Sequence, residues 1–177
     1  MTIELLGLGY RKRSGKDTIA DHLVRTQGFV KVSWADALKE GVNAWHGWDE
    51  RHAYGDLKEV VDPYWGYSPR EAYQKIGTDL VRNQWMQDFW VKAAMRRVEK
   101  HQLAGRPVVL ADVRFPNEAA AILSLGGEVW RIDRPGLPTE DLHESETALD
   151  GFDGWTRIVE NDGTVADLLD NATRGIR

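Results

Sequence analysis

Residues 6–23, "LGLGYRKRSGKDTIADHL", nearly spell a phosphate-binding loop, which makes them the most informative stretch of the chain. That motif reads G-x-x-x-x-G-K-[ST]. Here Gly9 and Gly15 enclose five residues, one more than the motif has, and Asp17 stands where a Ser or Thr should follow Lys16. The stretch is therefore a near match with one additional residue and a displaced hydroxyl group.

The surroundings of the stretch suit a phosphate-binding loop. Residues 2–8 form a short apolar run that predicts a buried strand, and from Lys16 onward the apolar residues fall on one face of a helix. A helix that begins after a glycine-bearing loop offers unpaired N–H groups and a favourable dipole to phosphate, and Lys16 is expected to reach the outer phosphates. The alternative is an ordinary turn in which Gly15 relieves strain and Lys16 is solvated. The position directly after the first strand favours phosphate binding.

The two departures from the motif have different meanings. Because "RSGKDT" is complete, the additional residue near Tyr10 and Arg11 is expected to bulge outward without moving Gly15 or Lys16. In GTPases a hydroxyl directly after the lysine binds Mg²⁺, whereas here the first hydroxyl is that of Thr18. This spacing resembles nucleoside monophosphate kinases, whose loops read Gly-Lys-Gly-Thr, and points away from switches and motors.

Composition narrows the class of protein. The 177 residues are 42% hydrophobic and 29% charged, which suits one globular domain with a proper core. The net charge of −5 argues against stable nucleic-acid binding, while local groups of arginines favour a small anionic substrate. There is no cysteine, and no apolar run approaches membrane-spanning length. We therefore expect a soluble, intracellular protein without a membrane partner.

The rest of the chain alternates between strand and helix signals, which predicts an α/β fold with a mainly parallel sheet. Ser68, Pro69 and Glu71 form a capping box at the start of one helix, and Thr164 caps the last helix. Further strands are expected at residues 29–33, 107–112, 128–133 and 157–161. Residues 45–67 lack periodicity and are expected to be irregular, and the nearby tryptophans are expected mostly to pack.

Five blocks in order, "KRSGKDT", "SPREAYQKIGTD", "DFWVKAA", "DVRFPNEAAAILSLGG" and "HESETALD", resemble the deoxynucleoside monophosphate kinases of tailed bacteriophages. The resemblance spans residues 3–170. It implies a single P-loop kinase domain over residues 1–177, with a monophosphate-binding insertion at about 36–85 and a lid at about 131–150. It also implies transfer of the γ-phosphoryl group of ATP to deoxynucleoside monophosphates with Mg²⁺, in the cytoplasm of an infected host cell. A homodimer is compatible with it.

The resemblance assigns the donor side of the site to the loop. The residues implied to bind ATP are Arg13, Ser14, Gly15, Lys16, Asp17 and Thr18. Thr18 is also a candidate metal ligand, and Lys12 is implied to face the acceptor. For Lys12 and Arg13 alone, a solvated basic turn is the alternative.

Asp112 and Arg114 follow the bare apolar strand, at the edge where open parallel sheets place ligand groups. Asp112 is expected to hold Mg²⁺ through water, and Arg114 to bridge the donor and acceptor phosphates. With Lys16 they form the predicted catalytic set. The alternative is an Asp–Arg ion pair in a turn.

The acceptor is assigned to residues farther apart in the sequence. Arg70 lies in the first turn of the capped helix, where its charge opposes the helix dipole and is consistent with phosphate binding; an ordinary surface arginine is the alternative. Leu38 and Lys39 are candidates on the preceding helix, Arg134 is expected to close over the phosphates, and Glu146 belongs to the "HESE" signature. Asn161 and Asp162 resemble the adenine-side loop of these kinases, although a helix-entry turn also explains them.

Two other functions remain open from the sequence. One is another small-acceptor P-loop kinase, such as a dephospho-coenzyme A kinase. The other is a non-kinase P-loop protein, either a nucleotide-binding regulator or a DNA-packaging ATPase. The second class normally has Ser or Thr directly after the loop lysine.

Overall fold

The computed structural model describes residues 3–137, 147–174 and 176. The chain divides into two compact units, which are described separately. The sheet unit comprises Met1–Ser33 and Met95–Arg177, and the helical unit comprises Trp34–Ala94. Among the described residues, none of the helices has the length and apolar character needed to span a membrane.

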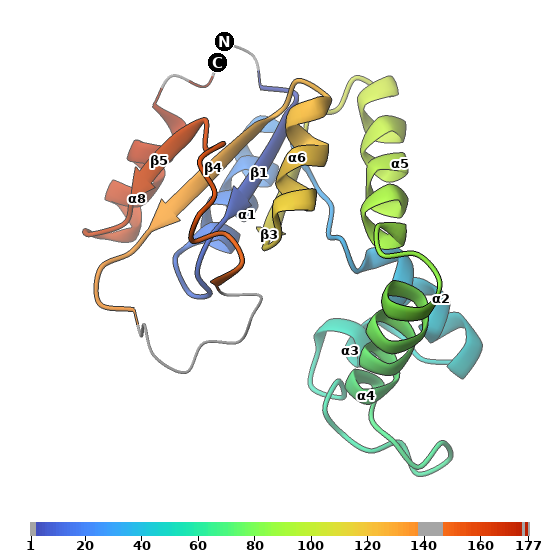
Figure 1. Cartoon of the computed structure of the whole chain (residues 1–177). Coiled ribbons are helices and arrows are strands. Elements are labelled where there is room, and N and C mark those ends of the chain that lie inside the picture. Colours follow the sequence, from blue (N-terminus) through green and yellow to red (C-terminus); the bar gives the residue numbers. More distant parts are fainter. Residues whose placement is uncertain (1–2, 138–146, 175, 177) are drawn as a thin grey trace. The chain divides into compact units, whose positions relative to one another are not determined.

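The sheet unit is built on five parallel strands, which confirms the predicted α/β fold (Figure 1). The strands are β1 (Leu5–Gly9), β2 (Val30–Lys31), β3 (Val108–Val113), β4 (Glu128–Asp133) and β5 (Arg157–Glu160). Their order in the sheet is β2-β3-β1-β4-β5. β1 is therefore central, and the loop that follows it emerges at the carboxyl edge between its neighbours β3 and β4.

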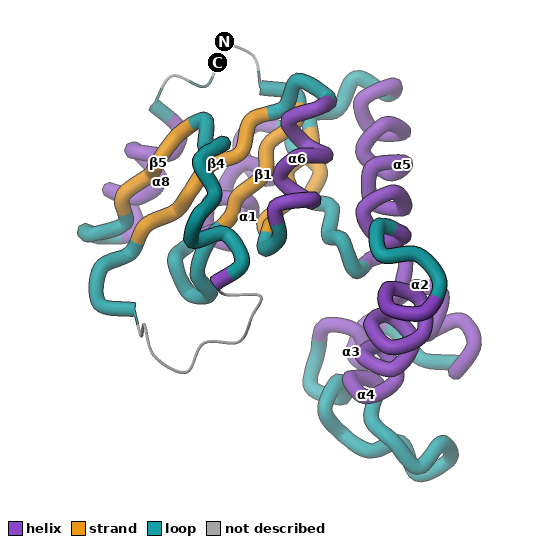
Figure 2. The backbone as a smooth tube through the Cα atoms, viewed as in Figure 1, coloured by secondary structure: helices purple, strands orange, loops and turns teal. Residues whose placement is uncertain are grey.

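Helices cover the sheet (Figure 2), and every residue of β1 is buried. They are α1 (Lys16–Gln27), α6 (Pro116–Ser124) and α8 (Val165–Thr173). Leu6 and Leu8 lie in one core cluster with residues of α1 and α8. Gly7 faces α6, where an added Cβ would lie 2.6 Å from Ile122 Cδ1. The lack of a side chain at Gly7 thus permits close packing of α6 on the central strand.

The helical unit contains α2 (Asp36–His46), α3 (Glu50–Tyr54) and α4 (Pro69–Gln74). The capping box is confirmed, because the Glu71 carboxylate accepts from the Ser68 backbone N–H at 2.7 Å and the Ser68 side chain accepts from the Glu71 backbone N–H. α4 runs on as a π-helix, η1 (Lys75–Arg82), in which Leu80 is 44% exposed. Because π-helical i→i+5 bonding widens the turn, later side chains rotate off the face an α-helix would present.

The segment expected to be irregular, residues 45–67, contains the end of α2, the helix α3 and a bridge between Asp62 and Tyr67. Asp49 caps α3 by accepting from the Arg51 backbone N–H at 3.0 Å. Of the tryptophans expected mostly to pack, Trp48 is buried, but Trp45 and Trp85 are 68% and 70% exposed. α5 (Phe89–Leu103) begins in the helical unit and ends in the sheet unit.

Candidate active site

The loop between β1 and α1 ends at Gly15, in a conformation that requires glycine. Its φ is +109°, and an added Cβ would lie 2.8 Å from both Asn161 Nδ2 and Leu168 Cδ2. Only glycine reaches this region of backbone space without strain. The loop is thus seated closely against the segment that follows β5.

Lys16 is held inside the loop. Its Nζ donates to the Tyr10 carbonyl at 3.1 Å, to the Arg11 carbonyl and to Ser14 Oγ at 3.3 Å. The residue is only 8% exposed. A buried ammonium group needs such oxygen partners. Lys16 is therefore not solvated, contrary to what the alternative of an ordinary turn predicted.

The additional loop residue does not bulge outward, contrary to expectation. Tyr10 has a φ of 89°, and its ring lies under the Arg131 guanidinium group, with Cζ 4.0 Å from the ring centroid. Trp155 meets the ring edge-on. Because the Tyr10 and Arg11 carbonyls point to Lys16, the extra length lines the inside of the loop.

The ends of β4 and β5 also contact the loop. Arg134 Nη1 donates to the Arg13 carbonyl at 3.2 Å, and Asn161 Nδ2 donates to the Ser14 carbonyl at 2.8 Å. A hollow of about 380 Å³ lies beside these contacts. Its lining residues are Asp133, Arg134, Pro135, Glu160 and Asp162. The hollow is rich in carboxylate groups, unlike the loop, which carries the cations.

The residues just after Lys16 lie in the first turn of α1. The Asp17 carboxylate is exposed and pairs with Lys31 Nζ at 2.8 Å, and Asp21 pairs with the same ammonium group at 2.9 Å. Burial by itself lowers the pKa of Lys31, but the hydrogen bonds and charges of the two carboxylates outweigh it and leave the pKa raised. Thr18 is partly exposed, and Lys12 is exposed.

Asp112 lies near the end of β3 with a partner that the sequence did not indicate. Its Oδ2 accepts from the Ser33 hydroxyl at 2.7 Å. Ser33 follows β2, which pairs with β3, so the two residues meet at the carboxyl edge. The signal that could have found Ser33 is its place directly after a strand at the edge where ligand groups gather.

Arg114 follows β3, and its backbone is held by Glu118. One Glu118 oxygen accepts from the backbone N–H groups of Arg114 and Phe115 at 2.7 and 3.1 Å. Glu118 is 8% exposed and lies in the first turn of α6. A carboxylate at this position stabilises a helix start. Glu118 thus fixes the backbone from which the Arg114 side chain extends.

Three predicted residues belong to the helical unit. Arg70 Nη1 pairs with Glu59 Oε1 at 2.6 Å. Lys39 Nζ lies 3.7 Å from the centroid of the Tyr54 ring. Leu38 is buried in the core of that unit, against Gly77, a packing role not foreseen from the sequence.

Part of the predicted site falls beyond what the structure describes. Glu146 and residues 138–145 of the expected lid lie outside the described residues. The described parts of the expected lid, before and after these residues, both contact the phosphate loop. Arg134 donates to the Arg13 carbonyl, and Asp150 pairs with Arg11 at 2.8 Å.

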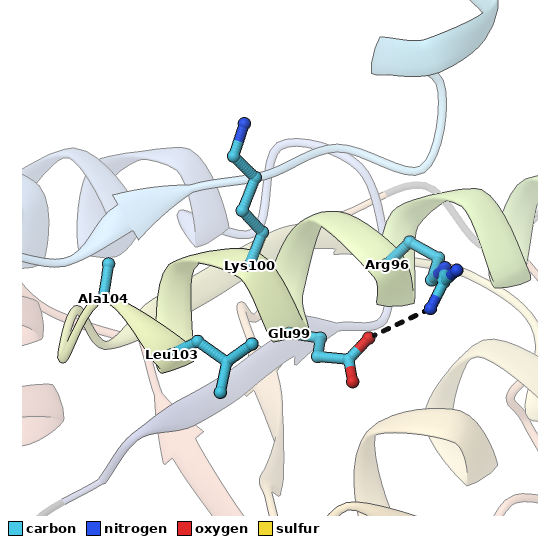
Figure 3. Close-up of a pocket in the computed structure, with 5 residues that line it drawn as sticks. All are labelled: Arg96, Glu99, Lys100, Leu103 and Ala104. Carbon is cyan, nitrogen blue, oxygen red and sulfur yellow. Dashed lines mark ion pairs between the residues drawn. The ribbon is translucent and has the colours of Figure 1, made fainter.

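A further hollow, of about 390 Å³, lies on α5 and the turn after it (Figure 3). Its lining residues are Arg96, Glu99, Lys100, Leu103 and Ala104. Figure 3 shows the Arg96 and Glu99 side chains turned toward each other, with Arg96 Nη1 3.6 Å from Glu99 Oε2. A single segment forms this hollow and it includes none of the predicted site residues, so it is not the candidate site.

The parallel sheet and the lysine-bearing loop after its central strand define a P-loop kinase fold. Two solved structures share the fold. TT1252 from Thermus thermophilus has a TM-score of 0.53 at 18% identity, covering 98% of this chain and 96% of that one. A sugar kinase from Janibacter sp. has a TM-score of 0.52 at 13% identity, covering 98% and 94%.

Sequence comparison gives the family. The model of the deoxynucleotide monophosphate kinase family matches residues 52–172. A protein of Acanthamoeba polyphaga mimivirus, provisionally described as such a kinase, is 34% identical over 96% of this chain and 98% of its own length. The deoxynucleotide monophosphate kinase of Enterobacteria phage T4 is 30% identical over 64% of this chain and 46% of its own length. The chain belongs to the deoxynucleotide monophosphate kinase family.

Proposed function

We propose that this protein transfers the γ-phosphoryl group of ATP to deoxynucleoside monophosphates, giving deoxynucleoside diphosphates and ADP. The observation that carries the proposal is the Lys16 ammonium group, held inside a glycine-ended loop at the start of a helix. This arrangement concentrates positive charge and N–H donors where a triphosphate can bind. Membership of the kinase family supplies the class of acceptor.

The charges of the sheet unit orient ATP. The phosphates belong at the loop, with Arg13, Ser14, Gly15, Lys16, Asp17 and Thr18 as the proposed binding residues. Asp17 is proposed to act through its backbone N–H at the helix start, because its carboxylate pairs with Lys31. The hollow beside the loop carries the carboxylates of Asp133, Glu160 and Asp162, which repel phosphate. Carboxylates accept hydrogen bonds from sugar hydroxyl and base amino groups. The nucleoside end of ATP is therefore assigned to the hollow.

The residues present fit a magnesium ion. Mg²⁺ in kinases is held by one or two protein groups together with substrate phosphates and water. Asp112 lies near the carboxyl end of β3, which pairs with β1 just before the phosphate loop, so one carboxylate is available at that edge of the sheet. Asp112, through water, and the Thr18 hydroxyl are the proposed ligands. When bound, the ion neutralises charge on the phosphates.

Transfer requires positioning and charge neutralisation more than proton transfer. An oxygen of the acceptor phosphate, already ionised, forms a bond to the γ-phosphorus, and the bond from that phosphorus to the bridging oxygen of ADP breaks. No histidine base is needed for an ionised nucleophile. Lys16 and Arg114 are proposed to stabilise the charge that spreads over the transferred group.

The acceptor is proposed to bind through Lys12, Leu38, Lys39, Arg70, Arg114, Arg134 and Glu146. The cations among them suit a monophosphate dianion. Residues 36–85 are proposed as the monophosphate-binding insertion and residues 131–150 as the lid. Because related kinases come from phages, we also propose action in the cytoplasm of an infected host cell. A homodimer is a further proposal, and size-exclusion chromatography with light scattering tests it.

The decisive experiment is ADP release by the purified chain with separate acceptors. We expect turnover with one or more deoxynucleoside monophosphates, and none above background with dephospho-coenzyme A or DNA. Turnover with dephospho-coenzyme A alone would assign the chain to another small-acceptor kinase class. Turnover stimulated only by DNA would indicate a motor. Product identification by mass spectrometry separates transfer from ATP hydrolysis.

A further inference from the structure

Tyr10, which lies in the part of the phosphate loop that is one residue longer than the motif, has a backbone conformation that its side chain disfavours. Its φ is 89°, whereas residues other than glycine rarely adopt positive φ, and a bulky residue there is a clear outlier. Such strain persists only where the surrounding structure holds the residue in place. The contacts of the Tyr10 ring therefore identify what holds it.

The ring is enclosed by three side chains from distant parts of the sequence and from the loop itself. The Cζ atoms of Arg131 and Arg11 lie 4.0 and 4.8 Å from the ring centroid, within the range of cation–π attraction. Trp155 meets the ring at a centroid distance of 6.3 Å and an interplanar angle of 85°. Trp155 is itself fixed, since it packs edge-on against Phe152 and covers Gly9.

The backbone that follows the Tyr10 Cα atom holds Lys16. The carbonyls of Tyr10 and Arg11 accept from Lys16 Nζ, and the lysine is almost fully buried. Rotation of Tyr10 to a negative φ would redirect the peptide groups that carry these oxygens. The ring contacts and the position of the ammonium group are therefore linked through one strained residue.

We propose that Tyr10 is a positioning residue, whose ring, held by Arg131 and Trp155, keeps the loop in the conformation that places the Lys16 ammonium group for the triphosphate. The longer loop then contains the residue that stabilises its own conformation. The consequence for ATP affinity rests on the proposed function, whereas the position of Lys16 does not.

Two substitutions distinguish the effect of the Tyr10 ring from the effect of the Tyr10 backbone conformation. Tyr10→Phe keeps the ring and all its described contacts. Tyr10→Gly removes the ring but adopts a positive φ without strain. If only the backbone conformation mattered, Tyr10→Gly would behave like the wild type. If the ring holds the loop, Tyr10→Gly alters Lys16 accessibility and ATP binding, whereas Tyr10→Phe behaves like the wild type.

The first readout is the acylation rate of Lys16 in the nucleotide-free protein, measured by mass spectrometry and normalised to the exposed Lys100. We expect wild-type rates for Tyr10→Phe and at least about threefold faster labelling for Tyr10→Gly, because the released ammonium group becomes accessible. Arg131→Lys, which keeps the positive charge but loses the planar group over the ring, should also label faster. It provides the test should Tyr10→Gly not fold, as judged by circular dichroism.

The second readout is ATP binding by calorimetry. Tyr10→Gly should bind about tenfold more weakly, equivalent to about 1.4 kcal/mol, while the KM for the monophosphate stays unchanged. The proposal is overturned if Lys16 is labelled at the wild-type rate in both Tyr10→Gly and Arg131→Lys. It is also overturned if Tyr10→Gly binds ATP with unchanged affinity. The labelling needs no transfer reaction, so a wild-type protein that transfers nothing overturns the proposed function alone.

Discussion

The side-chain amide of Asn161 donates a hydrogen bond of 2.8 Å to the carbonyl of Ser14, which joins the turn after β5 to the phosphate loop. Ser14 is fully buried, so its carbonyl depends on this donor. A buried acceptor that loses its partner costs about 1–3 kcal/mol. The bond therefore couples the shape of the loop to the turn after β5, in which the neighbouring residues Glu160 and Asp162 line the acidic hollow.

Asn161→Ala should weaken ATP binding, because the loop loses the donor that fixes Ser14. Asn161→Asp should weaken it further, since a carboxylate faces the carbonyl oxygen and repels the triphosphate. Calorimetry with ATP measures both effects, and thermal melting measures the accompanying loss of stability. Wild-type affinity in Asn161→Asp would contradict the coupling. Asn83→Asp, which adds the same charge at an exposed position, serves as the charge control.

Gly15→Ala should impair both stability and ATP binding. The added Cβ would meet Asn161 and Leu168 at 2.8 Å, in a backbone conformation with a φ of +109°. Strain of this kind costs about 1–3 kcal/mol. Gly136→Ala is the matched control, since Gly136 also has a positive φ but has nothing within 4 Å of an added Cβ. If the two variants lost equal stability and both bound ATP normally, the close seating of the loop would be irrelevant.

The fold was predictable because its signals are local. Bare apolar runs indicated the central strands, and the capping boxes at Ser68 and Thr164 appear as expected. The error at Tyr10 arose because its ring is held by Arg131 and Trp155, which lie more than a hundred residues away in the sequence. Ser33 was missed for the same reason, since its partner Asp112 comes from another strand. Contacts of this kind depend on the order of the strands in the sheet, which the spacing of apolar residues in the sequence does not reveal.

Lys16→Ala should abolish transfer and preserve the fold. The hydrogen bonds of its ammonium group to Tyr10, Arg11 and Ser14 all lie within the loop, so the helices and the sheet do not depend on them. Far-UV circular dichroism and ADP release, measured on the same sample, test both parts. The exposed lysine variant Lys100→Ala should retain turnover. Near-wild-type turnover in Lys16→Ala would refute the assignment of the phosphate loop.

Asp112→Asn should raise the Mg²⁺ concentration needed for half-maximal transfer. The substitution removes the negative charge proposed to hold the ion through water, and Mg²⁺ prefers anionic oxygen ligands. Ser33→Ala should shift the Mg²⁺ dependence in the same direction but less, because its hydroxyl only orients the carboxylate at 2.7 Å. Magnesium titrations of the initial rate measure both shifts. An unchanged dependence in Asp112→Asn would remove this residue from the proposed metal site.

Arg70 and Arg114 are expected to affect different kinetic constants. Arg70 is proposed to bind the acceptor in ground and transition states alike, and loss of such an interaction raises KM and spares kcat. Arg70→Ala should therefore raise KM for the monophosphate, with KM for ATP little changed. Because Arg70 pairs with Glu59 at 2.6 Å, Glu59→Gln is the control for loss of the ion pair alone, and it should leave both constants near wild type.

Arg114→Ala should instead lower kcat. Arg114 follows β3, its backbone is fixed by Glu118, and it is proposed to stabilise charge on the transferred group. Loss of one such electrostatic group lowers kcat by roughly 10²-fold or more. Steady-state kinetics with ATP and the monophosphate varied independently distinguish the two arginines. If Arg114→Ala kept its kcat, or if Arg70→Ala weakened ATP alone, the roles assigned to these residues would be wrong.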